Sequence, residues 1–247
     1  MGRILPEVFP VSHLLPATPQ RIRQMIAHGH PRTSDEWHPA PAPETTDLAR
    51  LRSAAKHCQA CPLYRKATQT VFGEGPRDAP LVLVGEQPGD QEDRAGHPFV
   101  GPAGQLLDRA LEEAGIDRQA AYVTNAVKHF KWEPRGKRRL HQKPNSRDMA
   151  ACKPWLNAEL RALQPRVLVL LGSTAAQTVL GPQARVLRDR GKARTSDYCE
   201  HTLITVHPSS LLRAPDEASR QRNYAEFVAD LKKAGHLLAR AEKSQGS

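Results

Sequence analysis

The chain has 247 residues and carries 36 Lys and Arg against 26 Asp and Glu, a formal net charge of +10. A chain of this length buries a full core, and the excess of positive charge suits a polyanionic partner such as nucleic acid, although a basic surface that only serves solubility would give the same count. No apolar run approaches the roughly 20 residues that span a bilayer, and Pro6, Glu7 and Pro10 interrupt the N-terminal apolar stretch, unlike a secretory signal. We therefore expect a cytoplasmic monomer with no membrane partner.

The first 46 residues differ in composition from the rest. Residues 1–46 contain eight of the 21 prolines, and the stretch HPRTSDEWHPAPAPETT is typical of a linker with polyproline character. We expect a poorly structured, proline-rich arm over residues 1–46, one domain over residues 47–242 and a short tail at 243–247.

From Asp47 onward, helical and strand patterns alternate. Nearly continuous Val, Leu and Ile runs at 80–85, 121–127, 166–172 and 202–208 are typical of strands buried on both faces. Helical patterns begin at Asp47 and lie over the ranges 103–115, 145–165, 173–181 and 216–242. The alternation predicts an α/β fold, a three-layer sandwich around a four-stranded parallel sheet, in which ligands bind at the carboxyl ends of the strands.

Polar side chains follow these runs. Glu86 and Gln87 follow the first run, where a carboxamide can read a base edge and a carboxylate can orient a base or nucleophile. Asn125, in the second run, offers a donor and an acceptor on one side chain, which can pair with the edge of a base. His207 in the fourth run can stabilise charge that develops on a leaving group. Phe99, in a glycine-rich loop, can form one wall of a flat pocket.

Each of these signals is weak alone, because acidic turns and core phenylalanines are common. Four polar loops at four strand ends nevertheless form one constellation. Among the cysteines, Cys58-x-x-Cys61 indicates a metal site, because a close pair in a reducing compartment is more often a metal site than a disulfide.

These segments resemble the family 4-like uracil-DNA glycosylases of the uracil-glycosylase superfamily, over about residues 54–235. The resemblance is carried, in the same order, by the cysteine pair, GEQPGD, HPFVGPAG, VTNAVK, CKPWL, VLVLLG and HPSSLLR. The sequence has GEQPG where ordinary members have GEAPG, and VKH where they have VKC. It also carries the insertion GKRRLH at 136–141, similar to the KRRIH loop of the cross-linking X-type branch (UdgX), with Leu140 in place of Ile.

The resemblance implies an enzyme of DNA base-excision repair, a hydrolase that removes uracil from DNA. In the X-type branch, the loop histidine, here His141, captures C1′ of the abasic sugar and leaves the protein covalently linked to DNA. Glu86 would orient or deprotonate His141, and His207 would stabilise the uracil anion. The residues assigned to the uracil pocket are Gln87, Asp90, Phe99, Asn125 and His207.

The resemblance also suggests how DNA is held. We expect uracil-containing DNA as the partner, with single strands preferred. The residues assigned to phosphate are Lys137, Arg138, Arg139, Ser209 and Ser210, and Leu211 would wedge into the base stack.

The family's cofactor is a [4Fe–4S] cluster, and the positions that match its ligands are Cys58, Cys61, His129 and Cys152. Cys199 would complete a set of four thiolates, but it lies far along the chain from the family's ligand positions, and we expect a free thiol. Zinc remains the alternative, because a Cys₃His set is common at zinc sites. We expect the cluster to be structural.

Two other functions compete. One is a conventional turnover glycosylase in which His141 only touches DNA. The other is a non-catalytic, iron–sulfur DNA-binding or sensing protein on a retained fold, and the intact set of Glu86, Asn125 and His207 argues against it.

Overall fold

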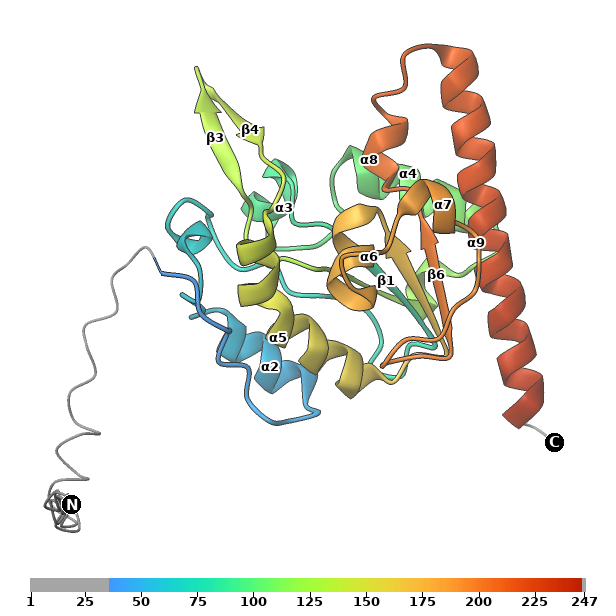
Figure 1. The fold of residues 1–247 in the computed structure, drawn as a ribbon, viewed down its shortest axis with the longest axis horizontal. Helices are drawn as coiled ribbons and strands as arrows, with labels where there is room; N and C mark the ends of the chain where they lie inside the picture. The colour runs from blue at the N-terminus through green and yellow to red at the C-terminus, as the bar shows by residue number, and fades with distance from the viewer. Residues whose placement is uncertain (1–35, 246–247) are drawn as a thin grey trace, which may run out of the picture. The chain divides into compact units, whose positions relative to one another are not determined.

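The computed structural model describes residues 36–245, which contain a sheet of four parallel strands (Figure 1). The strands lie in the order β2-β1-β5-β6, and their bounds are β1 (Leu81–Gly85), β2 (Ala121–Asn125), β5 (Val167–Leu171) and β6 (His201–Thr205). The prediction of a four-stranded parallel sheet is confirmed. Among the described residues, no helix combines the length and apolarity needed to cross a membrane.

Helices cover both faces of the sheet. One core packs α4 (Pro102–Glu113) and α9 (Glu217–Gln245) against one set of strand side chains, such as Leu81 and Leu83. The other core packs α5 (Ser146–Leu163) and α6 (Ser173–Leu180) against the alternate set, such as Val82 and Val84. Because both faces are buried, every position of β1 is apolar apart from its terminal glycine, which explains the continuous runs in the sequence.

The remaining elements are short or peripheral. Helix α2 (Leu48–Ala55) packs on α5. The other helices have the bounds η1 (Pro62–Arg65), α3 (Asp90–Ala95), η2 (Arg118–Ala120), α7 (Val186–Asp189) and α8 (Pro208–Leu211). The three-layer sandwich expected from the sequence is thus present, with α3 and α8 among the elements that the sequence did not predict.

An antiparallel hairpin stands where the sequence suggested only a basic loop. It consists of β3 (Trp132–Arg135) and β4 (Arg138–His141), paired from Trp132 opposite His141 to Arg135 opposite Arg138. Its two-residue turn uses Gly136 at φ +60°, a conformation that glycine adopts at little cost. Figure 1 shows the hairpin projecting on the side toward which the strands of the sheet point.

The packed part of the chain begins earlier than residue 47. The backbone amide of His38 donates to Ala60, that of Ala40 donates to Ala151, and Ala40 is buried. The segment 36–46, which the sequence assigned to the end of the arm, therefore lies against the domain. Residues 1–35 lie outside the described residues, as do 246 and 247, while α9 continues through 243–245 of the predicted tail.

A buried ion pair joins the segment that follows β2 to α5. Lys128, 1% exposed, donates to Glu159, which is fully buried, and also to the Thr124 hydroxyl (2.7 Å) and the Asn125 carbonyl (2.8 Å). Glu159 also accepts from the Tyr122 hydroxyl at 3.0 Å. The pair is stable in the interior because both charges are fully hydrogen-bonded.

We expect Lys128→Ala to lower the free energy of unfolding by about 3–5 kcal/mol, because it leaves a buried carboxylate without its counterion. Denaturant titration measures the change. The matched control is Arg220→Ala, which removes an exposed ion pair to Glu217 and should cost no more than about 0.5 kcal/mol. A loss below about 1 kcal/mol for Lys128→Ala would contradict this view of the pair.

Candidate active site

The side chains of Asn125 and Phe99 meet at Gly85, where β1 ends beside the end of β2. A Cβ atom added to Gly85 would lie 2.4 Å from Asn125 Oδ1 and 2.6 Å from the Phe99 ring, so only glycine leaves room for both side chains. Asn125 and Phe99 are both buried. The structure therefore brings together the amide and the aromatic ring that the sequence assigned to one pocket.

The Phe99 backbone is strained. Its φ is +59°, a left-handed conformation that non-glycine residues rarely adopt and that clusters at functional sites. A Cβ on Gly104 of α4 would lie 1.7 Å from the Phe99 carbonyl oxygen, so the helix packs directly on this turn. The ring centroid of Phe99 lies 6.2 Å from that of His207, with an interplanar angle of 26°. The strain thus serves to place a ring beside the histidine.

His207 is arranged as a neutral hydrogen-bond donor. Its Nδ1 accepts from the Ser209 backbone amide (3.2 Å) and lies 2.8 Å from the Ser209 hydroxyl, which assigns the ring proton to Nε2. Burial, together with the nearby His141 and Arg213, lowers the pKa of His207 to about 4. A neutral imidazole that keeps its Nε2 proton can donate to an anion as it forms.

His141, the last residue of β4, lies beside Glu86, which follows β1. Its Nε2 is 3.5 Å from Glu86 Oε1, and the other Glu86 oxygen accepts from the Thr174 hydroxyl. Burial lowers the pKa of His141, against the opposing effect of Glu86, and Arg213 lowers it too. A lowered pKa leaves a ring nitrogen with a free electron pair at neutral pH, as a nucleophile requires. The sequence did not single out Thr174 or Arg213, although Arg213 ends the HPSSLLR segment.

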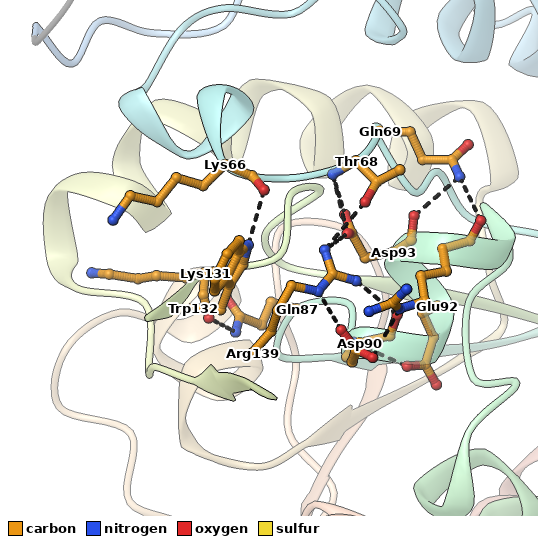
Figure 2. A network of polar contacts seen from close by, with 12 residues as sticks. Lys66, Thr68, Gln69, Gln87, Asp90, Glu92, Asp93, Lys131, Trp132 and Arg139 are labelled. Carbon is orange, nitrogen blue, oxygen red and sulfur yellow. Dashed lines mark hydrogen bonds and ion pairs between the residues drawn. The ribbon is translucent and has the colours of Figure 1, made fainter. Parts of the chain in front are cut away.

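Arg139 holds the hairpin instead of facing solvent. Its guanidinium, with the side chain 13% exposed, donates to Asp93 Oδ2 at 2.6 Å and to Asp90 (Figure 2). It also lies 5.3 Å from the Phe130 ring centroid and 5.4 Å from that of Trp132. This differs from the predicted roles of Arg139 at phosphate and Asp90 at uracil, because the two side chains bind each other.

Gln87 also supports the hairpin. Its Nε2 donates to the carbonyls of Lys131 (3.2 Å) and Gln142 (3.0 Å), and its Oε1 accepts from the Lys131 amide at 3.1 Å. The predicted contact of Gln87 with a base edge is not what the structure shows, because its amide is occupied by backbone on both sides. A hairpin that the sequence did not reveal supplies these partners.

The predicted DNA contacts fall into two groups. Lys137 and Arg138 are exposed at the hairpin, as a phosphate contact requires. Ser209 is bonded to the His207 ring, and the Ser210 hydroxyl donates to the His207 carbonyl at 2.7 Å. Both hydroxyls thus order the loop of His207.

The prediction that Leu211 wedges into the base stack is wrong. It is 2% exposed and packs in the core beside α4, so it is not available to wedge between bases. Its neighbour Leu212 is 42% exposed and is the apolar side chain that this loop presents to solvent.

Three buried cysteines gather near α5. Burial raises the pKa of Cys61 to about 11 and that of Cys152 to about 12, with a contribution from Cys58 to the first and from Cys61 and Cys58 to the second. Cys58 accepts from the Trp155 indole at 3.1 Å, and Cys152 accepts from the Lys128 amide at 3.2 Å. Cys199 is apart, and its thiol donates to the Arg166 carbonyl.

His129 is buried next to this group. Its Nε2 lies 2.9 Å from the Thr70 hydroxyl, which itself donates to the Ala55 carbonyl, so the imidazole donates and Nδ1 keeps its electron pair. Burial lowers the pKa of His129 to about 4. Thiols and a neutral imidazole are suitable iron ligands. Over residues 36–245, no three His, Cys, Asp or Glu side chains converge on a position for a single metal ion.

Comparison with known proteins places this site in a family. Residues 72–232 match the model of the uracil DNA glycosylase superfamily. A type-4 uracil-DNA glycosylase of Pyrobaculum aerophilum is 38% identical over 176 residues, which cover 68% of this chain and 86% of that protein. Another from Thermotoga maritima is 40% identical over 159 residues, 64% of this chain and 79% of that protein. The chain belongs to the uracil-DNA glycosylase superfamily.

We expect the His207 ring to stay neutral from neutral pH down to about pH 4, because its burial disfavours the charged form. The unfolded chain binds this proton near pH ~6.5, so the stability that His207 contributes is present above that pH and is lost as the pH falls toward 4. Nitrogen chemical shifts measured by NMR, and unfolding of wild type against His207→Gln, test both statements. A ring that titrates near pH ~6.5 would be inconsistent with a neutral donor.

Proposed function

We propose that this protein excises uracil from DNA and then becomes covalently linked to the abasic sugar through His141. The observation that carries the proposal is the pairing of His141 with Glu86 at 3.5 Å, in a site that also contains His207, Asn125 and Phe99. The names of the relatives, type-4 uracil-DNA glycosylases, support the first half. The hairpin that carries His141 supports the second.

Excision uses the pocket residues. The base leaves the stack and enters the pocket, where Phe99 stacks on it and the Asn125 amide pairs with its imide edge. The bond between C1′ and N1 breaks with its electron pair on uracil. The Nε2 proton of His207 then stabilises the uracil anion, at no cost for protonating the ring beforehand.

Capture uses the hairpin. The sugar cation left by excision accepts an electron pair from a His141 ring nitrogen, and a C–N bond to C1′ forms. The ring proton displaced by this bond passes to Glu86 or to water, and uracil takes up a proton on release. An imidazole held beside C1′ competes with water at an effective concentration of ~10⁵ M or more when it is well oriented. The product is an N-glycoside on His141, and we assign no residue of the site to expelling the imidazole again.

The DNA strand approaches over the hairpin. Lys137 and Arg138 are exposed there and suit phosphate contacts, and Leu212 suits the space vacated by the flipped base. A flipped nucleotide costs less to present in single-stranded DNA, so we propose that single strands are preferred and that one monomer acts on one site.

The buried donors near α5 fit a [4Fe–4S] cluster held by Cys58, Cys61, Cys152 and His129. Three thiols and one neutral imidazole form a donor set for iron, and the thiols would give up their protons on binding. When bound, the cluster would tie α5 to the segments around residues 58–61 and 129. That is a structural role, because these segments adjoin β2 and the base of the hairpin.

We expect wild-type protein and uracil-containing single-stranded DNA to form a complex that survives boiling in detergent, with at most one DNA per protein. His141→Ala should abolish this complex yet still release uracil, because water can then reach C1′. Denaturing gels measure the adduct, and chromatography measures free uracil.

DNA of the same sequence without uracil is the control and should give no adduct. Glu86→Gln should slow capture, because it removes the carboxylate beside the imidazole. A heat-stable complex undiminished in His141→Ala would assign the link to another residue. Many turnovers by wild type without adduct would favour a conventional glycosylase.

We also expect the purified protein to be brown and to contain about four irons per chain, the content of the proposed cluster. His129→Ala should lower the iron content and the visible absorbance, because it removes one ligand. Cys199→Ala should change neither, because Cys199 is bonded to backbone away from the other cysteines. Stoichiometric zinc without iron in a colourless protein would refute the cluster.

A further inference from the structure

Asp148 is a fully buried carboxylate at the first turn of α5, and three donors converge on it. It accepts from the Trp37 indole N–H at 2.9 Å, from the Lys131 ammonium at 2.7 Å and from the Asn145 amide at 2.9 Å. The Asn145 bond is an ordinary helix cap. The bonds from Trp37 and Lys131 are not explained by capping, because they bring two distant segments of the chain to one carboxylate.

Lys131 is held at both ends. Its ammonium binds Asp148, and its backbone amide and carbonyl bind the Gln87 side chain. The Lys131 carbonyl also accepts from the Gln142 amide at 2.9 Å, which closes the base of the hairpin. Lys131 therefore anchors the hairpin to α5 and to the loop after β1.

The position of Lys131 fixes that of His141. Trp132 pairs with His141 across the hairpin, and Lys131 and Gln142 are the next residues on each strand. A shift of Lys131 therefore moves His141 with it. Asn125, Phe99 and His207 belong to other parts of the fold, so the same shift leaves the excision residues in place.

Trp37 completes the anchor from the N-terminal segment. Its indole N–H binds Asp148, and Arg147 lies over its ring, 5.7 Å from the centroid. By covering the carboxylate, this segment keeps water from the Lys131–Asp148 ion pair, which strengthens the pair. Residues 36–40 thereby acquire a role in the site, although they lie far from it in sequence.

We propose that Lys131 and Asp148, covered by Trp37, are positioning residues that decide how often the sugar cation is captured by His141 instead of water. The proposal rests on the proposed function, since it presumes that His141 competes with water for C1′. Its distinctive consequence is a change in the ratio of adduct to released uracil. A residue that only stabilised the fold would lower both together.

The test is the captured fraction, adduct divided by total uracil released, measured in single turnover on uracil-containing single-stranded DNA. For Lys131→Met we expect this fraction to fall about three- to tenfold while uracil release changes by less than about twofold, since a ~1 Å misplacement of a reacting group costs up to ~100-fold. Lys131→Arg, which keeps the ion pair, should restore most of the fraction. Trp37→Phe, which keeps the ring and loses the donor, should give an intermediate value.

Lys233→Met is the matched control, because it also removes a lysine paired with a buried carboxylate, Asp230, but on α9 away from the hairpin. It should leave the captured fraction unchanged. Preparations of equal iron content and equal melting temperature are compared, and Trp37→Phe serves if Lys131→Met folds poorly. An unchanged captured fraction in both Lys131→Met and Trp37→Phe, or a parallel fall of adduct and released uracil, would overturn the proposal. Wild type that gives no adduct would instead overturn the proposed function itself.

Discussion

The buried ion pair of Lys128 and Glu159 is the interaction on which both functional regions depend. The Lys128 ammonium binds the Asn125 carbonyl at the end of β2, and Glu159 lies on α5, so the pair fixes the pocket to the cysteine-bearing helix. The Lys128 amide donates to Cys152, and the next residue is His129. One residue therefore positions the floor of the pocket and two proposed metal ligands. Two buried charges are retained here because each is surrounded by donors or acceptors from different segments.

The same principle, burial set against a neighbouring charge, distinguishes the two histidines of the site. His207 is half-buried and lies near His141 and Arg213, so its pKa is strongly lowered, and the Ser209 amide on Nδ1 keeps the ring proton on Nε2. His141 is more exposed and has Glu86 beside it, which opposes the effect of burial. A neutral donor, His207, and the proposed nucleophile with an adjacent carboxylate, His141, are thus obtained from one residue type. The surroundings of each histidine, through burial and neighbouring charges, determine its pKa and hence its role.

The sequence predicted the sheet and its covering helices well, because continuous apolar runs and helical periodicity arise directly from burial on both faces. It also located Phe99, Asn125 and His207, since polar or aromatic residues beside the ends of parallel strands have few other positions to occupy. It did not reveal the hairpin, where charged residues hide the strand pattern. Because the hairpin was not predicted, the contacts that Arg139 and Gln87 make with it were not predicted either. A sequence cannot distinguish an exposed arginine from one paired with Asp90 and Asp93. The sequence assigned the exposed leucine of this segment to Leu211, whereas Leu211 is buried and its neighbour Leu212 is exposed. Successive residues of a helical turn point in different directions, which the sequence alone does not orient.

The capture that we propose requires more than a histidine near the pocket, and the anchoring of the hairpin supplies it. Its contacts with the rest of the domain include those of Arg139 to the acidic side chains of α3, of Gln87 to the backbone at its base, and of Lys131 to Asp148. Each contact joins the hairpin to a different element, so the hairpin cannot rotate about any one of them. Because the sugar cation is short-lived, a nucleophile that must first find its place loses to water, whereas one already in place does not. Rigidity of the hairpin, obtained through these polar anchors, is therefore the structural condition that the proposed covalent capture requires.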